Sequence, residues 1–381
     1  MRICLVYDCL FPHTVGGAER WYRDLALRLA ANGHQVTYLT LRQWEREEQP
    51  DVPGVHVVTA GPRMALYSRP GQRRILPPLV FGAGVLWHLL RRGRRYDVVH
   101  TASFPYFSLL AAACARALHR YTLIVDWIEL WTREYWREYL GPLGGRIGWL
   151  VQKACIRVHQ RAFCLAELTR ARLREEGIRG HVTVLRGLYA GAASPAPPLP
   201  GEPLVVAAGR MIPEKRAHAV VDAVHRARER LPELRAVIFG DGPERERVIG
   251  RIHELGLDGV VEAPGFVAAE EVRSTLARAL CLLHPSRREG YGLVVVEAAA
   301  AGVPSIVVRH PDNAAAELVE DDVNGVVAAD AGAEALADAI ARIAAAGPAL
   351  RRSTADWYAR NADALSLDAS LDTVVEAYEA V

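Results

Sequence analysis

Two glutamates, Glu289 and Glu297, stand in a mostly apolar, glycine-bearing stretch, HPSRREGYGLVVVEAAAAGVPSIV, at 284–307. An ionised carboxylate accepts hydrogen bonds strongly from neutral hydroxyls, whereas it repels phosphate. The turn between the glutamates offers backbone N–H groups to an anion such as a diphosphate, and these belong to Gly290, Tyr291, Gly292 and Leu293. The pattern predicts sugar hydroxyls on both sides of a diphosphate. In the alternative interpretation Glu289 is a loop charge and Glu297 a solvated helix residue.

The elements that position this turn are predicted to be a strand, a helix and a second strand. The run at 279–286 is apolar and ends in a loop, 293–302 is compatible with a helix, and 303–308 is again apolar. Such a unit is a right-handed crossover between parallel strands, and ligands bind at the carboxyl ends of such strands.

Two cations, Arg210 and Lys215, follow a predicted strand that ends in Gly209. At a strand's carboxyl end they could neutralise a diphosphate and the charge that grows as a phosphate leaves. Among 46 basic residues only Lys153 and Lys215 are lysine. Because lysine is so rare in the chain, its presence at position 215 favours a role for the compact ammonium group. In the alternative interpretation Arg210 and Lys215 are ordinary surface cations.

Two further turns, 239–244 and 264–267, end successive predicted strands. They are predicted to line a nucleotide base through main-chain groups, although each is also typical of an ordinary turn. The residues concerned are Gly240, Gly242, Phe266 and Val267. Neither turn has the G-x-G-x-x-G pattern after a first strand, which disfavours a nicotinamide cofactor.

The first half of the chain carries a second anion-compatible turn, in which Gly16 and Gly17 precede a helix predicted from about Ala18 to Ala31. His13 and His100 lie in predicted strand-end loops and are candidates either for acid–base work at the acceptor or for a structural role.

Aromatic residues gather at 126–141, where i, i+4 spacing predicts one helical face. This face could stack on an acceptor sugar, meet a membrane interface or pack in the core, and it comprises Trp127, Trp131, Tyr135 and Tyr139. The apolar segment 75–90 has arginines on both sides, which predicts either peripheral membrane contact or a buried helix.

The composition is that of a globular protein, with 51% hydrophobic and 24% charged residues. The net charge of +2 gives no reason to expect nucleic acid as a partner. The six cysteines lack metal-ligand spacing, and the acids at 320–322 lie in a polar turn, so we expect no metal. With no signal-peptide pattern, we expect a cytoplasmic protein.

Alternating strands and helices predict an α/β fold with two doubly wound parallel-sheet domains. The proline-rich segment 189–203 is the predicted boundary. We therefore expect a first Rossmann-like domain at 1–190, a second at 191–360 and a last helix within 361–381. Tandem domains of this kind are expected to leave a cleft for ligands.

In this order, GGAE, GRMIPEKR, FGDGPE, PGFV and the stretch 284–307 closely resemble the retaining glycosyltransferases of family 4, which have the GT-B fold. The resemblance covers about 204–327 most strongly, reappears at 1–40 and 97–104, and is weak at 42–95. Where many members have a histidine this chain has Asp126, which becomes a catalytic candidate. Where relatives often have paired glycines it has Arg309 and His310.

The resemblance implies that the second domain binds a nucleoside diphosphate sugar and the first binds the acceptor. Arg210 and Lys215 would hold the diphosphate, Glu289 the sugar hydroxyls and Glu297 the ribose. Gly16 and Gly17 would close from the first domain, and the last helix would cross back to it. The donor is a substrate, so no cofactor is expected.

The predicted function is therefore retaining sugar transfer to an acceptor hydroxyl on a glycolipid, a polysaccharide or a natural-product glycoside, either in the cytoplasm or at the cytoplasmic face of the membrane. A nucleotide-sugar epimerase with the same fold would need additional acid–base residues. A nucleotide-sugar sensor would bind without turnover.

Overall fold

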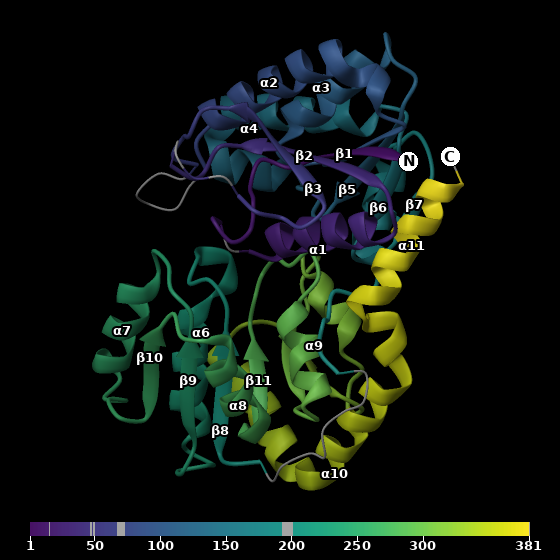
Figure 1. Cartoon of the computed structure of the whole chain (residues 1–381). Coiled ribbons are helices and arrows are strands. Elements are labelled where there is room, and N and C mark those ends of the chain that lie inside the picture. The colour runs from purple at the N-terminus through teal and green to yellow at the C-terminus, as the bar shows by residue number, and fades with distance from the viewer. Residues whose placement is uncertain (15, 46–47, 49, 67–72, 193–200, 381) are drawn as a thin grey trace. The chain divides into compact units, whose positions relative to one another are not determined.

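The computed structural model describes residues 1–14, 16–45, 48, 50–66, 73–192 and 201–380. The chain forms two compact units, each built on its own parallel sheet (Figure 1). The first unit contains Met1–Leu185 and Ser370–Val381, and the second contains Arg186–Ala369. The two doubly wound domains predicted from the strand and helix pattern are confirmed.

The sheet of the first unit has the order β3-β2-β1-β4-β5-β6-β7. Every described pairing within it is parallel, and the central strands are apolar because helices cover both faces. Its strands are β1 Arg2–Val6, β2 Gln35–Leu41, β3 Val55–Gly61, β4 Val98–Ala102, β5 Thr122–Trp127, β6 Arg161–Cys164 and β7 Val182–Val184.

Figure 1 shows α2, α3 and α4 over one face of this sheet and α1 over the other. Helix α1 was predicted to begin near Ala18 and begins at Gly17. The helices of the first unit are α1 Gly17–Ala31, α2 Leu76–Arg92, η1 Gly93–Arg95, α3 Tyr106–Arg116, α4 Arg133–Ile156 and α5 Glu167–Glu175.

The sheet of the second unit has the order β10-β9-β8-β11-β12-β13. Side chains alternate along its strands between two apolar clusters, so that Val205 faces one and Val206 the other. The strands are β8 Leu204–Ala208, β9 Arg235–Phe239, β10 Val261–Gly265, β11 Cys281–His284, β12 Ser305–Val308 and β13 Gly325–Ala328.

Helices α6, α7 and α10 supply one cluster, and α8, α9 and η3 supply the other. The second unit contains η2 Pro213–Lys215, α6 Ala217–Ala227, α7 Arg245–Glu254, α8 Ala269–Arg278, α9 Leu293–Ala300, η3 Ala314–Leu318 and α10 Ala333–Leu365. The last helix, α11 Leu367–Glu379, belongs to the first unit from Ser370 onward.

Two details differ from the prediction or fall outside it. Trp127 is the last residue of β5 and α4 begins only at Arg133, so the prediction of one helical aromatic face from 127 to 139 is wrong. Of the proline-rich segment 189–203, residues 193–200 lie outside the described residues, and the units divide after Leu185.

Candidate functional site

The carboxyl edge of the second sheet carries most of the predicted donor site, and main-chain hydrogen bonds join its loops. The N–H of Gly209 donates to the carbonyl of Phe239 at 3.0 Å, and that of Gly240 to Gly265 at 2.9 Å. Gly240 has a φ of 124°, and a Cβ there would lie 1.9 Å from the Gly209 oxygen. A glycine is therefore required at position 240 for the close approach of the ends of β8 and β9.

Gly242 has a similar role one loop further on. Its φ is 152°, and a Cβ would lie 2.5 Å from the carbonyl oxygen of Met211. Two main-chain hydrogen bonds of 2.8 and 2.9 Å join Met211 to the same loop. The loop after β9 thus supports the segment that carries Arg210 and Lys215.

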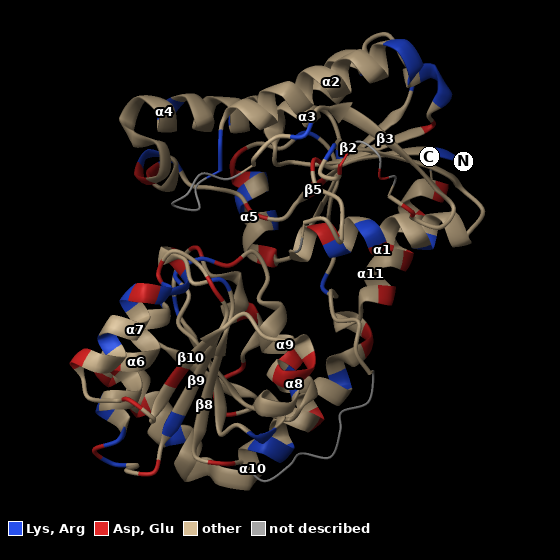
Figure 2. Ribbon diagram, turned by 60° about the vertical axis from the view of Figure 1, so that its left-hand side comes forward, with Lys and Arg blue, Asp and Glu red and all other residues tan. Residues whose placement is uncertain are grey.

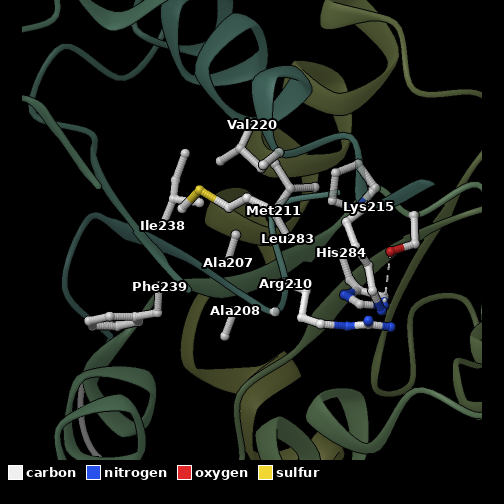
Figure 3. Close-up of a pocket in the computed structure, with 14 residues that line it drawn as sticks. Ala207, Ala208, Arg210, Met211, Lys215, Val220, Ile238, Phe239, Leu283 and His284 are labelled. Carbon is white, nitrogen blue, oxygen red and sulfur yellow. Dashed lines mark hydrogen bonds between the residues drawn. The ribbon is translucent and has the colours of Figure 1, made fainter. Parts of the chain in front are cut away.

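A small pocket lies where β8 and β11 end (Figure 3). Arg210, Lys215 and His284 gather at one end of it, while Ile238 and Val220 lie at the other. Its free volume of about 20 Å³ is on the order of one water molecule, so the pocket itself can receive a single polar group of a larger ligand.

The carboxylate of Glu289 lies beside this pocket and is shared by two partners. Lys215 Nζ binds Oε1, and His284 Nε2 lies 2.6 Å from the same oxygen. The Glu289 side chain is only 11% exposed. Burial by itself raises its pKa, but the charges and hydrogen bonds of Lys215 and His284 lower the pKa well below its usual value.

The main chain around Glu289 is fixed from a neighbouring loop. The N–H of Glu289 donates to the main-chain carbonyl of Asp312 at 3.0 Å, and the carbonyl of Glu289 accepts from the N–H of Ala314 at 3.0 Å. The buried Asn313 amide donates to the carbonyls of Ser286 and Val308. These contacts hold Glu289 in place before α9 begins.

The glycine turn after Glu289 has the backbone expected for an anion site. Gly292 caps α9 with a φ of 106°, and α9 begins at Leu293. Within the described part of the chain, the N–H groups of 290–293 donate no main-chain hydrogen bond. They are therefore available as a group at a helix N-terminus.

Tyr291 and Glu297 extend the site toward the first residues of the second unit. The Tyr291 hydroxyl donates to the Arg186 carbonyl at 2.5 Å. Burial, followed by the nearby Glu297 carboxylate, raises the pKa of Tyr189. Glu297 is thus one helical turn into α9 and near Tyr189, half-buried rather than fully solvated.

Two predicted donor residues are open to solvent. Arg210 is exposed, and the Phe266 side chain is 82% exposed at the end of β10. Val267 instead packs against an apolar cluster. An exposed phenylalanine beside a strand end can cover a planar ligand.

In the first unit, Gly16 caps α1 and Gly17 is exposed. A Cβ on Gly16 would lie 2.3 Å from the Glu19 carboxylate, which folds back over the turn. This carboxylate faces the helix N-terminus that was predicted to attract an anion. His13 is exposed and lies near Trp44, with 5.3 Å between ring centroids.

His100 and Asp126 come together, but in the interior of the first unit. His100 Nε2 lies 2.8 Å from Asp126 Oδ1, and Trp21 Nε1 donates to Oδ2 at 2.8 Å. His100 is 0% and Asp126 4% exposed. This burial favours a structural role over contact with substrate, and the predicted catalytic and acceptor roles stay predictions.

The two tryptophans predicted to contact the acceptor separate in the structure. Trp127 is fully buried and donates to Gln160 at 2.9 Å. Trp131 is half-buried and packs against Tyr135 and Tyr139 with ring centroids 4.7 and 5.1 Å away. Core packing therefore accounts for Trp127, whereas Trp131 keeps a partly open face.

Sequence reasoning missed His284, Ser286 and Asn313. The available signal was a histidine at the last position of an otherwise apolar buried strand, directly before Pro285 and Ser286. It also missed the ion pair of the buried Asp8 with Arg73, one of the arginines that flank the apolar segment 75–90.

Two further observations concern metals and membranes. Across the described residues no group of three His, Cys, Asp or Glu side chains could hold a metal ion. The same residues contain no helix long and apolar enough to cross a membrane. The absence of a cofactor and the cytoplasmic location stay predictions.

Comparison with known proteins places this geometry in a family. The model of the Glycosyl transferases group 1 matches residues 194–360, and that of Glycosyltransferase Family 4 matches 15–187. The chain is 33% identical over 148 residues to a GDP-mannose-dependent alpha-(1-6)-phosphatidylinositol monomannoside mannosyltransferase of Mycobacterium tuberculosis, covering 37% of this chain and 38% of the relative. The chain spans less than half the length of the curated relatives that it matches at 32 or 33% identity.

Two solved structures are similar over the whole chain. Sucrose-phosphate synthase from Thermosynechococcus elongatus has a TM-score of 0.79 at 20% identity, covering 99% of this chain and 98% of that one. Anabaena Alr3699/HepE in complex with UDP-glucose has a TM-score of 0.74 at 18% identity, covering 100% of both. The chain belongs to the group 1 and family 4 glycosyltransferases and has the GT-B fold.

Proposed function

We propose that the chain transfers a sugar, with retention of its anomeric configuration, from a nucleoside diphosphate sugar to an acceptor hydroxyl. The observation that carries the proposal is the half-buried pair of Lys215 with Glu289, which lies directly before a glycine turn whose N–H groups are available. An ammonium and a helix N-terminus suit a diphosphate, and a carboxylate beside them suits sugar hydroxyls.

In this proposal Lys215 moves from Glu289 to the diphosphate when the donor binds. Arg210, which is exposed at the end of β8, adds a second positive charge. The N–H groups of 290–293 then receive the diphosphate or sugar, and Glu297 receives the ribose. Catalysis comes from positioning and from stabilising the charge on the leaving diphosphate.

Retention is proposed from the resemblance to the retaining glycosyltransferases of family 4, and the lining of the pocket gives no support to a double displacement through a carboxylate nucleophile. None of its lining residues is Asp or Glu. The Glu289 carboxylate, which lies beside the pocket, is held by two donors on the same oxygen, which lowers its nucleophilicity. We therefore infer a front-face displacement in which the departing phosphate accepts the acceptor's proton.

A uridine diphosphate sugar is the first donor to test, because UDP-glucose is the ligand named for the Anabaena structure. The experiment is a thermal-shift panel of UDP, GDP, ADP, TDP and their sugar conjugates. Ligand at 100 times its dissociation constant adds about 2.7 kcal/mol of apparent stability. We expect one nucleotide family to stabilise the wild type and to stabilise Lys215→Ala and Glu297→Ala much less.

Lys153→Ala is the matched control, since Lys153 is the other lysine of the chain and pairs with Glu176 in the first unit. If no nucleoside diphosphate or sugar conjugate shifts the melting temperature of the wild type, the donor site is wrong. If Lys153→Ala abolishes the shift while Lys215→Ala keeps it, the site has been placed on the wrong lysine.

We also propose that the first unit contacts an anionic membrane surface through α2. The exposed apolar side chains of this helix and the residue before it are Ile75 at 63%, Leu76 at 60%, Leu79 at 43%, Trp87 at 59% and Leu90 at 40%. Figure 2 shows Lys and Arg at the end of α2 and uncharged residues along its length. Apolar side chains followed by arginines suit lipid with anionic headgroups.

Vesicle flotation tests this contact, with phosphatidylcholine alone and with added phosphatidylglycerol. Binding is expected only with the anionic lipid, and it should fall for the combined Arg91→Gln, Arg94→Gln and Arg95→Gln variant. Arg352→Gln and Arg360→Gln, two exposed positions on α10, serve as the control. Equal binding by wild type and the α2 variant would contradict the proposal.

A further inference from the structure

His284 is the last residue of β11, which lies between β8 and β12 inside the second sheet. The three residues before it are apolar and fully buried, and His284 itself is 4% exposed. Its register partner in β12 is Val307. A polar ring at this position loses its hydration and has to be compensated by a hydrogen bond.

That hydrogen bond goes to the carboxylate of the donor site. Nε2 of His284 lies 2.6 Å from Oε1 of Glu289 and 3.3 Å from the hydroxyl of Ser286. Because an ionised carboxylate only accepts, Nε2 must carry the proton. A neutral ring protonated at Nε2 is sufficient for this contact, and a charged ring is not required.

The second donor to the same oxygen is Lys215. Under the proposed function this ammonium turns to the diphosphate when the donor binds, and Glu289 loses its ion pair with Lys215 at that moment. A buried carboxylate left without a donor takes up a proton or moves. The contact with His284 does not involve the diphosphate and can persist throughout.

We propose that His284 is a positioning residue that holds Glu289 ionised and oriented after Lys215 has moved to the donor. With Oε1 occupied by the imidazole, Oε2 is left to accept a sugar hydroxyl. The inference rests on the proposed function and adds a residue to it. The titratable and charged groups that line the pocket or lower the Glu289 pKa are Lys215 of η2, His284 of β11 and Arg210 after β8.

The test compares His284→Leu with His284→Gln, because the amide nitrogen of glutamine can reach the place of Nε2. Residues that orient metal ligands by a hydrogen bond typically change activity by about 10- to 100-fold when removed, and we expect the same scale for His284 and Glu289. We expect His284→Leu to lower kcat by that factor with nucleoside diphosphate affinity within about 3-fold. The acid limb of its kcat–pH profile should also move to higher pH, because the pKa of Glu289 rises when the hydrogen bond from His284 is lost.

His284→Gln should restore most of kcat and should return the acid limb of the kcat–pH profile to its wild-type position. His225→Leu, at an exposed position on α6, is the control for replacing a histidine in this unit. An unchanged pH profile in His284→Leu, or equal losses in both His284 variants, would overturn the proposal. If the wild type binds no nucleotide, it is the proposed function that fails.

A measurement on the wild type covers the case in which His284→Leu does not fold. Nitrogen chemical shifts of the histidine rings report which nitrogen carries the proton. We expect His284 to be protonated at Nε2 both without ligand and with bound nucleoside diphosphate. A ring protonated only at Nδ1 in either state would overturn the inference, because it could not donate to Glu289.

Discussion

The hydroxyl of Tyr378, near the end of α11, pairs with Nδ1 of His100 in the middle of the first sheet. Both side chains are 0% exposed. The other ring nitrogen of His100 is bound to Asp126, so the last helix is joined to a buried polar network. An ion pair of 2.6 Å between Arg28 and Asp372 fixes the same helix to α1.

Tyr378→Phe should destabilise the first unit. The substitution leaves Nδ1 of His100 buried without its partner, and such a loss costs about 1–3 kcal/mol. Urea unfolding followed by fluorescence measures it. Glu376→Gln, exposed on the same helix, should leave the free energy of unfolding unchanged. Equal stability of Tyr378→Phe and wild type would show that the network does not anchor α11.

Glu289 should make stability depend on pH in the acid range. Its pKa in the folded chain is well below the value of 4.5 that it has without structure. Its contribution is therefore fully present above about pH 4.5 and is lost as the pH falls toward the lowered pKa. The melting temperature of Glu289→Gln should fall less than that of the wild type over this interval. If the melting temperatures of the wild type and Glu289→Gln fall in parallel with pH, the lowered pKa of Glu289 is contradicted.

Lys215→Ala should lower stability as well as nucleotide binding. The Lys215 side chain is 23% exposed, so part of the interaction is screened, and we expect a loss of about 1–3 kcal/mol. A Lys215→Ala, Glu289→Gln double variant should recover part of it, because no buried charge is left unpaired. Chemical denaturation of the four proteins gives the coupling energy, and strictly additive losses would exclude a direct pair.

Gly240→Ala should disturb the donor edge of the second sheet. The new Cβ would meet the Gly209 oxygen, and the positive φ is unfavourable for alanine. We expect a lower melting temperature and weaker nucleotide binding. The matched control is Gly250→Ala in α7, where a Cβ has open space and should stabilise the helix by about 0.5–1 kcal/mol. Similar behaviour of the two variants would exclude the steric explanation.

The sequence predicted the fold class and the main elements of the donor edge because these depend on local patterns. Strand, glycine turn, helix and strand at 279–308 follow from periodicity and from Gly292 and Gly302. The neighbouring strand ends could be placed on one edge because parallel strands share it.

The unpredicted features depend on contacts between distant residues. Lys215 and Glu289 are 74 positions apart and Asp8 and Arg73 are 65 apart, so no spacing rule links them. The contact of His284 with Glu289 spans only five positions, but it requires the turn to fold back on the strand end. Trp127 was misplaced because i, i+4 spacing also occurs by chance where a strand runs into a loop.

The proposed function requires that a diphosphate takes Lys215 from Glu289. Since the chain has two lysines, protein labelled with ¹³C at lysine should give two side-chain Cε signals, which Lys153→Arg assigns. Titration with UDP, GDP, ADP and TDP should shift and saturate the Lys215 signal for one of them and leave that of Lys153 in place. If the Lys215 signal stays fixed while a nucleotide binds, the diphosphate does not bind Lys215 and the proposed donor site is wrong.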